Sequence, residues 1–413
     1  MAQGTRRGMT QGLWRNRNFR LLFGAATLTN LGDGLLAVAV PWLATLLTDN
    51  PVLIGMVAGA RELPWFLFSL PAGVVTDRFD HRRLLIACDS LRVALLLGLV
   101  TLATMASPGT ASVAALIAMT FALGAVEVLR DNTNQSFLPA LVDQTQLEQA
   151  NGLLWSTEET AGRFVGPPLA GVLIGVAIAV PFGLQAALLA GAIGLMSRLS
   201  LPPAAPKPRP PFVAALREGL RWLWAHPVLR RLAITLGIYN FIGSMFFALL
   251  VLYAQRVLGL GAAEYGLLLA AAAAGGVAGS LLGPALLRRL PPGAGLFLGL
   301  IGFIFASAVL AVSHSVALIA VALVVEAFFN LLWNLTTVSY RQRHIPPALM
   351  GRVNAAYRFF GTGPAAFGSV TGGLLVAAGA GLGPEAALRL PYAVCAAGAG
   401  LILIYAAFRL RLT

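Results

Sequence analysis

The stretch Gly-Val-Val-Thr-Asp-Arg-Phe-Asp-His-Arg-Arg, residues 73–83, decides how the rest of the chain is interpreted. It lies between two apolar runs that are each long enough to cross a bilayer. It places five ionisable side chains and a histidine in one short link. Basic links between membrane spans lie on the cytoplasmic side. The stretch therefore predicts both a membrane protein and its orientation.

The composition excludes a soluble protein. Of the 413 residues, 58% are hydrophobic and 11% are charged, whereas a soluble domain has about a quarter charged residues. The apolar residues form many runs of about 20 residues, the length that a helix needs to cross the hydrocarbon core. Continuous hydropathy excludes an outer-membrane barrel, whose strands would alternate. We therefore predict an all-α integral membrane protein.

We predict twelve transmembrane helices. They cover residues 21–47, 52–76, 84–106, 112–138, 152–176, 178–200, 232–255, 264–287, 294–313, 316–339, 354–379 and 387–408. The N-terminal six-helix half then covers 1–200, and the C-terminal six-helix half covers 232–413. Between them, 201–231 forms a cytoplasmic linker that begins proline-rich and continues as an amphipathic helix.

The basic residues set the orientation. On the predicted topology, 22 Lys and Arg residues fall on one side and two, Arg256 and Arg389, on the other. Such an asymmetry places both termini in the cytoplasm and the chain in the inner (plasma) membrane as a multi-pass protein. The formal charge of +13 is explained by these loops, so no nucleic-acid partner is predicted.

The chain repeats itself at a separation of about 200 residues. The segment from Gly55 to Arg78 is echoed from Gly266 to Arg289, and the segment from Asn151 to Gly171 is echoed from Asn354 to Gly373. Two pseudo-symmetric six-helix bundles related by a parallel repeat are typical of one transporter architecture. Its substrate pathway lies between the halves.

The opening stretch resembles the motif between helices 2 and 3 of the major facilitator superfamily, whose pattern has a glycine at the position of Asp80. Its Asp-Arg-Phe-Asp-x-Arg-Arg form resembles the branch that contains macrolide-efflux and enterobactin-exporter proteins. Residues 162–171 are similar to the Gly-Pro motif of drug:proton antiporters, with Val172 in place of the second glycine of its terminal pair. The resemblance covers essentially the whole chain and implies the major facilitator fold and proton-driven export.

Asp33 is a candidate for proton coupling. It lies mid-span between Gly32 and Gly34, which allow close backbone approach. Charges inside spans are costly and mark functional positions, and desolvation favours the protonated form of a carboxyl, as a proton carrier requires. We predict that Asp33 carries the proton, with Asn30 beside it on the pathway. The alternative is a carboxylate permanently satisfied by Asn30 or by an arginine.

The fourth span presents Glu127, Arg130 and Asp131 on one helical face. In one interpretation, Arg130 pairs alternately with two carboxylates, and protonation of one of them shifts the conformational equilibrium. We therefore include all three residues in the proton-coupling set. In the other interpretation, the group lies at the cytoplasmic end of the helix and only locks helices together.

The tenth span carries Glu326, Asn330 and Asn334 at intervals of four residues, so they share one stripe of the helix. Glu326 follows Glu127 at close to the repeat distance. The symmetry predicts a pathway-lining face in both halves. The alternative is polar residues that hold neighbouring helices together.

Charged residues also interrupt the second and fifth spans. Arg163 is expected to form a static ion pair with Glu159, and Arg61 with a carboxylate. On an α-helix, Glu158 points about 100° away from Glu159, so we predict that Glu158 faces the pathway, as does Glu62.

Three aromatic residues within spans are predicted to stack on an organic substrate. The alternative is packing or a place in the interfacial belt. They are Tyr239, Phe247 and Trp333.

The opening stretch is also predicted to act as a conformational latch. Gly73 would allow close packing against the other half, and Asp77 would cap a facing helix. The degenerate copy at 283–289 keeps the basic pair and lacks the acid. We therefore expect an inner latch that stabilises the outward-facing state. Its predicted residues are Gly73, Asp77, Arg78, Arg82, Arg83, Asp89, Arg92, Gly166 and Pro167.

No Walker sequence or zinc-ligand spacing is present, so we predict no enzyme, no metal and no cofactor, with the proton gradient as energy source. The sequence predicts a monomeric secondary efflux transporter that exchanges hydrophobic or amphiphilic organic compounds, such as a drug, antibiotic or siderophore, for protons by alternating access in the lipid bilayer. Two alternatives stay open. They are a proton-coupled nutrient symporter, against which the Gly-Pro resemblance argues, and a non-transporting receptor or assembly protein.

Overall fold

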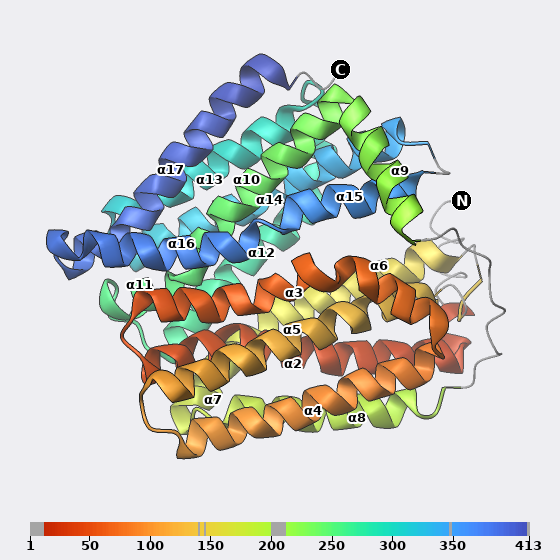
Figure 1. Ribbon diagram of the computed structural model, residues 1–413, viewed down its shortest axis with the longest axis horizontal. Helices are drawn as coiled ribbons and strands as arrows, with labels where there is room; N and C mark the ends of the chain where they lie inside the picture. Colours follow the sequence, from red (N-terminus) through yellow and green to blue (C-terminus); the bar gives the residue numbers. More distant parts are fainter. Residues whose placement is uncertain (1–11, 139–140, 144–145, 200–211, 347–348, 411–413) are drawn as a thin grey trace.

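The computed structural model describes residues 12–138, 141–143, 146–199, 212–346 and 349–410, and all its regular elements in these ranges are helices (Figure 1). The predicted all-α membrane fold is confirmed. The first group is α2 (Arg17–Leu47), α3 (Pro51–Arg78), α4 (His81–Met105), α5 (Thr110–Phe137), α6 (Leu147–Thr157), η3 (Glu158–Val165), α7 (Gly166–Val176) and α8 (Val180–Met196). The second is α9 (Phe212–Ala225), α10 (Pro227–Ala248), α11 (Leu250–Arg256), α12 (Ala262–Leu287), α13 (Ala294–Val312), α14 (Val316–His344), α15 (Met350–Thr362), α16 (Ala365–Ala378), η4 (Gly379–Leu382) and α17 (Pro384–Arg409).

Ten helices in the described part of the chain are long and apolar enough to cross a membrane. The two other predicted spans coincide with shorter helical segments. The sixth is α8, which has 17 residues, and the fifth is a continuous helical rod divided among α6, η3 and α7. The hydropathy pattern therefore located the helices, while ten of the twelve predicted spans meet the length and composition of a membrane helix.

Local sequence explains where the helices begin. Asn50 accepts a hydrogen bond from the backbone N–H of Val52 and is followed by Pro51, a residue well suited to the first helical position. Asp80 accepts one from the N–H of Arg83 at 2.8 Å and thereby caps α4. The acidic residue that departs from the superfamily pattern in the 73–83 stretch is thus a helix cap.

The fifth predicted span contains a π-helical segment, η3. Gly166 follows it, and the next two residues, Pro167 and Pro168, have no N–H to donate to the preceding turn. A wider π turn accommodates the break. The irregular turn of the helix thus coincides with the Gly-Pro stretch.

The helices form two packed groups. Helices α2 to α8 pack mainly with one another, as do α10 to α17, and the groups meet where α3 packs on α16 and α7 packs on α12. Figure 1 shows the groups as two layers that approach each other on the side where α11 lies, which we call the opposite side, and diverge toward the side of α9 and α6, which we call the linker side. The division into halves at 1–200 and 232–413 stays a prediction.

Two glycines permit the contact between the groups. A Cβ atom on Gly55 of α3 would lie 2.5 Å from the backbone oxygen of Ser369 in α16, and one on Gly266 of α12 would lie 2.3 Å from that of Pro167 in α7. Distances this short exclude any larger side chain. On the opposite side, Arg256 also forms an ion pair with Asp49 across the same interface, at 2.6 Å.

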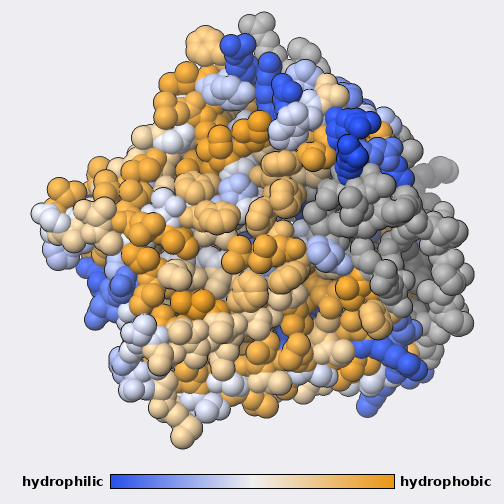
Figure 2. All heavy atoms as spheres, viewed as in Figure 1, coloured by the Kyte–Doolittle hydropathy of each residue, from blue (hydrophilic) through white to orange (hydrophobic). Residues whose placement is uncertain are grey.

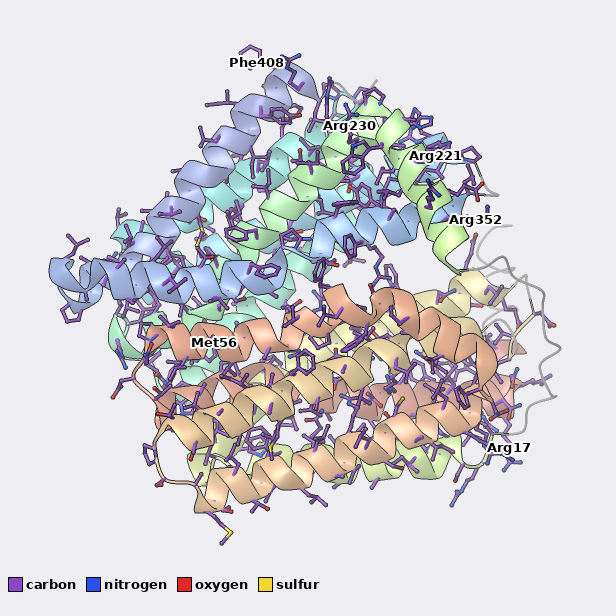
Figure 3. The ribbon with its side chains drawn as sticks, in the orientation of Figure 1. Arg17, Met56, Arg221, Arg230, Arg352 and Phe408 are labelled. Carbon is purple, nitrogen blue, oxygen red and sulfur yellow. The ribbon has the colours of Figure 1, made fainter. Side chains whose placement is uncertain are left out.

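The amphipathic helix of the linker, α9, docks on α15. Glu218 forms an ion pair with Arg352, and Leu223 is fully buried. Figure 3 shows Arg221, Arg230 and Arg352 around α9 on the linker side. Apolar side chains dominate the middle of the face in Figure 2, whereas the hydrophilic ones gather at its rim. This distribution is the one expected of a chain surrounded by lipid.

Candidate functional site

Two adjoining cavities lie between the helix groups. The larger has a volume of about 900 Å³ and is lined from both groups, with Leu22, Leu138 and Leu335 at its linker-side end. The smaller, about 470 Å³, lies toward the opposite side. Phe247 and Glu326 line both. The cavities follow the interface at which the repeat predicted the substrate pathway.

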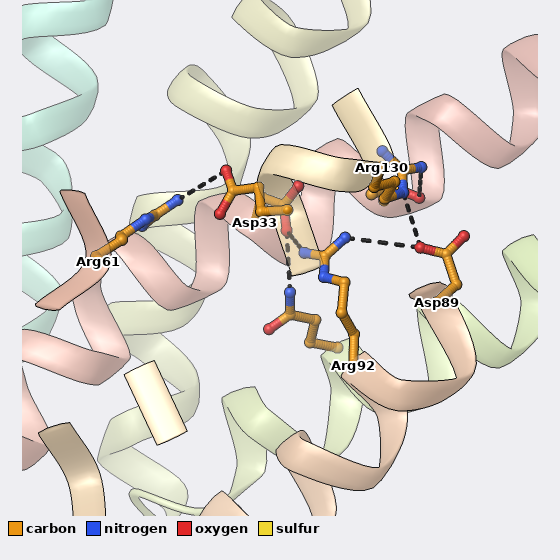
Figure 4. Close-up of polar contacts among 8 residues, drawn as sticks. Asp33, Arg61, Asp89, Arg92 and Arg130 are labelled. Carbon is orange, nitrogen blue, oxygen red and sulfur yellow. Dashed lines mark hydrogen bonds and ion pairs between the residues drawn. The ribbon is translucent and has the colours of Figure 1, made fainter. Parts of the chain in front are cut away.

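A chain of charged side chains borders the larger cavity (Figure 4). Asp33 of α2 forms an ion pair with Arg92 of α4 and accepts a hydrogen bond from Gln185 of α8 at 3.1 Å. Arg92 also approaches Asp89 at 3.8 Å, and Asp89 accepts a hydrogen bond from Arg130 of α5 at 2.7 Å. Four helices therefore meet in one network.

Burial divides this network into an accessible part and an enclosed part. The side chains of Asp89 and Arg92 are 1% and 2% exposed, whereas that of Asp33 is 25% exposed and lines the cavity. Arg130 also lines the cavity and donates to the hydroxyl of Thr29 at 3.1 Å. Asp33 is thus a member of the network that is both exposed to the cavity and paired with the buried arginine.

The predicted partners differ in part from those observed. Asp33 is held by an arginine, as one of the two interpretations required, but Asn30 instead donates to Thr157 at 2.7 Å. Asp89 and Arg92, predicted as part of the latch, lie in the network beside Asp33. Pairing of residues in the first and third spans depends on helix packing, which a hydropathy pattern does not predict. Gln185 was not predicted, although a lone amide in an apolar span was the available signal.

The remaining charges of α5 face the same cavity. Glu127 forms an ion pair with Arg61 of α3 at 3.6 Å, which gives Arg61 the carboxylate partner that was expected. Asp131 lines the larger cavity and has no ion-pair partner among the described residues. Glu62 lines the smaller cavity. Arg130 bonds Asp89 of α4, and its predicted alternation between two carboxylates stays a prediction.

The π turn changes the geometry of the fifth span. Arg163 contacts Glu159 at 3.4 Å, as predicted, and also Glu158 at 3.0 Å. The contact with Glu158 was not predicted, because residues five apart come onto one face only in a π-helix. Both glutamates nevertheless line the larger cavity.

Helix α14 presents a hydrogen-bonded ladder to the cavities. Asn334 donates to the side chain of Asn330 at 2.9 Å, and Asn330 donates to Glu326 at 3.1 Å. All three line the larger cavity, as the repeat predicted. The side chain of Glu326 is buried, whereas Asn334 is exposed.

The three predicted aromatic residues have different surroundings. Phe247 is 42% exposed and lines both cavities. Tyr239 lines only the smaller one, and its ring is stacked on that of Trp333 at a centroid distance of 4.8 Å. Trp333 is 1% exposed and lines neither cavity. Trp333 therefore packs against Tyr239 on the side away from the cavity.

The predicted latch residues are distributed over several contacts. Arg82 donates to the backbone oxygens of Met196 and Ser197 at the end of α8, and Arg83 is exposed. Gly166 lies against Gly34 of α2, where an added Cβ would come within 2.6 Å of its Cα atom. Pro167 lines the larger cavity. The surroundings of the other three predicted latch residues lie outside what the structure describes. They are Gly73, Asp77 and Arg78.

Comparison with known proteins shows the family of this chain. The family model described as "transmembrane secretion effector", one of the major facilitator superfamily, matches residues 11–412. The enterobactin exporter EntS of Shigella boydii is 28% identical over 392 residues, covering 94% of this chain and 89% of that protein.

Solved structures agree with this fold. A bacterial homologue of the human lysosomal transporter Spinster, in an inward-facing and unoccupied conformation, has a TM-score of 0.74 at 16% identity, covering 96% of this chain and 97% of that one. A bacterial homologue of the iron transporter ferroportin, in an inward-facing state, has a TM-score of 0.71 at 18% identity, with coverages of 95% and 98%. At these identities, the likeness shows the fold alone.

Proposed function

The chain belongs to the transmembrane secretion effector family of major facilitator transporters, and on this premise we propose that it exports hydrophobic or amphiphilic organic compounds in exchange for protons. Its homologues named as enterobactin exporters support the direction of transport. The small-molecule path would be the pair of cavities between the two helix groups. The observation that carries the proposal is the ion-pair network that opens on this cavity through Asp33.

The proposed coupling follows from that network. Protonation of Asp33 removes its charge and weakens its hold on Arg92, which then has Asp89 as its remaining acidic neighbour at 3.8 Å. Because α2 and α4 are joined through this pair, the change alters the balance between conformations. Glu127, Arg130 and Asp131 would extend the proton-coupling set along α5. Asn30, Glu62, Glu158, Glu326, Asn330 and Asn334 would line the substrate path.

The proposed orientation places the linker side in the cytoplasm, because the predicted excess of basic residues lies there. The larger cavity extends to that side, while α3 meets α16 and α7 meets α12 toward the other. The structure would then be an inward-open state that receives substrate from the cytoplasm or the inner leaflet.

Inside-out membrane vesicles test the function. An imposed pH gradient should drive uptake of exported compounds, chosen by comparing the drug susceptibility of a host with and without the gene. Asp33→Asn should abolish the pH-driven component, while Asp49→Asn, which changes a carboxylate on the opposite side, should retain it. Full pH-driven transport by Asp33→Asn would refute the coupling, and absence of gradient-driven uptake for every compound would refute the exporter.

A further inference from the structure

Glu326 is a buried carboxylate without a cation. Its side chain is 3% exposed, and its one hydrogen-bond partner among the described residues is Asn330. No Lys, Arg or His of the described chain lies within ion-pairing distance. A lone ionised carboxylate in such surroundings is costly. Glu326 therefore has to carry a proton or receive a positive charge from a ligand.

The surroundings of Glu326 favour an organic cation. Tyr239 is 4% exposed, lines the same cavity, and has a hydroxyl without a hydrogen-bond partner among the described residues. Its ring lies 5.2 Å from that of Phe303, which also lines the cavity, and Phe247 exposes its side chain there. A carboxylate beside aromatic rings attracts cations through both charge and the ring quadrupole. The unpaired hydroxyl is a polar contact for the same ligand.

The charges around the cavities point the same way. Acidic residues of the lining outnumber basic ones, although the whole chain has a net charge of +13. The acidic residues are Asp33, Glu62, Glu127, Asp131, Glu158, Glu159 and Glu326, and the basic ones are Arg61, Arg130 and Arg163. The three arginines all have carboxylate partners. An uncompensated negative charge remains for a ligand to neutralise.

We propose that Glu326, with Tyr239 and Phe247, binds the positively charged group of an amphiphilic organic cation, and that a proton replaces this cation on the same carboxylate. This proposal rests on the proposed function and specifies its substrate class. The two ligands compete for one acceptor, so substrate and proton occupy the site in turn. The ladder from Asn334 through Asn330 leads from the exposed part of α14 to that acceptor.

Among the helices around Glu326, α3 brings one other carboxyl group to the smaller cavity, that of Glu62. Helix α13 has no ionisable residue, and in α12 the sole charged residue is Glu264, in its first turn. Helix α10 contributes Tyr239, while α3 brings Arg61 and Glu62 to the wall of the same cavity. Arg61 forms its ion pair with Glu127. A pH dependence of cation binding that disappears with Glu326 would accordingly belong to this carboxylate.

The probe is tetraphenylphosphonium, a permanent cation, with tetraphenylborate as an anion of matched size and shape. Calorimetry on the purified full-length protein should show binding of the cation and not of the anion, weaker binding at mildly acid pH, and release of a proton in weakly buffered solution at the acid end. These measurements on the unaltered chain need no variant. Equal binding of the two probes, or cation binding without proton release at any pH, would overturn the proposal.

Glu326→Gln should weaken cation binding by about tenfold or more and remove its pH dependence, while its amide can still contact Asn330. Glu264→Gln, which alters an exposed glutamate in α12, should bind as the unaltered protein does. Unchanged binding by a folded Glu326→Gln protein would refute the site. Proton-driven export of other compounds without cation binding would refute the cation site and leave the proposed function standing. Cation binding through Glu326 without proton-driven flux would support the cation site and refute the proposed function.

Discussion

Gly55 and Gly266 stand at equivalent positions of the internal repeat, and each lies against a backbone carbonyl of the other helix group. Their partners, Ser369 and Pro167, are separated by about the same repeat distance. The two interfaces, α3 with α16 and α7 with α12, are therefore related by the symmetry of the repeat. Any motion that separates the groups on the opposite side has to separate both contacts.

Gly55→Val should hinder closure on the opposite side, because the added atoms would overlap the carbonyl of Ser369, and overpacking costs about 1–3 kcal/mol. We expect transport in reconstituted vesicles to fall by about tenfold. Gly175→Val is the matched control, since a Cβ at Gly175 meets nothing within 4 Å. Equal transport by the two variants would show that this contact does not limit the cycle.

The sequence located the helices well because hydropathy and length respond to the same physical requirement, the thickness of the bilayer. The repeat also brought Glu326 and Glu127 to the walls of one cavity. It could not predict that Arg92 binds Asp33, since contacts between spans depend on packing. The π turn does not follow from the α-helical period, because that period does not show where a helix changes its hydrogen-bond spacing.

Asp33 and Arg92 should be energetically coupled. Asp33→Asn leaves the buried guanidinium with Asp89 alone, and Arg92→Gln leaves Asp33 with Gln185 alone. We expect each single change to lower stability, and the double change to recover part of the loss, with a coupling energy of about 1–3 kcal/mol. Thermal unfolding in detergent measures this. Additive effects would mean that the pair is not coupled.

The same double variant separates the effect of the pair on stability from its effect on the coupling of transport to protons. If the charge of Asp33 transmits the proton signal, the protein with both Asp33→Asn and Arg92→Gln should recover part of its stability and still lack pH-driven transport. A control with Asp49→Asn and Arg256→Gln removes an exposed pair, which contributes little to stability. Recovery of pH-driven transport by the Asp33 and Arg92 double variant would contradict the proposed coupling.

Gln185→Leu should shift the pH profile of transport toward higher pH. The amide donates to the carboxylate of Asp33, and loss of a hydrogen bond to the charged form favours the protonated form. The rate at saturating proton concentration should change less than the midpoint. Transport measured across a pH series gives both quantities.

Gln149→Leu is the control for this change, since Gln149 lies in α6 and lines neither cavity. It should keep the midpoint of the unaltered protein. A midpoint that stays fixed in Gln185→Leu, or that moves to lower pH, would show that the hydrogen bond does not stabilise the charged carboxylate during the cycle.

Gly219→Leu should release α9 from α15. A Cβ atom at Gly219 would lie 2.3 Å from the backbone oxygen of Arg352, so the larger side chain cannot fit without displacing the helix. Displacement would also break the ion pair between Glu218 and Arg352. We expect faster trypsin cleavage after Arg217 and Arg221, because unfolding of a short helix away from its partner exposes its backbone.

Mass spectrometry of the first tryptic fragments measures this release. Gly152→Leu is the matched control, because Gly152 in α6 has open space at its Cβ position, and its cleavage pattern should stay as in the unaltered protein. If α9 couples the linker to motion of the C-terminal helices, Gly219→Leu should also lower the transport rate. Unchanged cleavage at both arginines would show that α9 is held by contacts other than this close backbone approach, such as the buried side chain of Leu223.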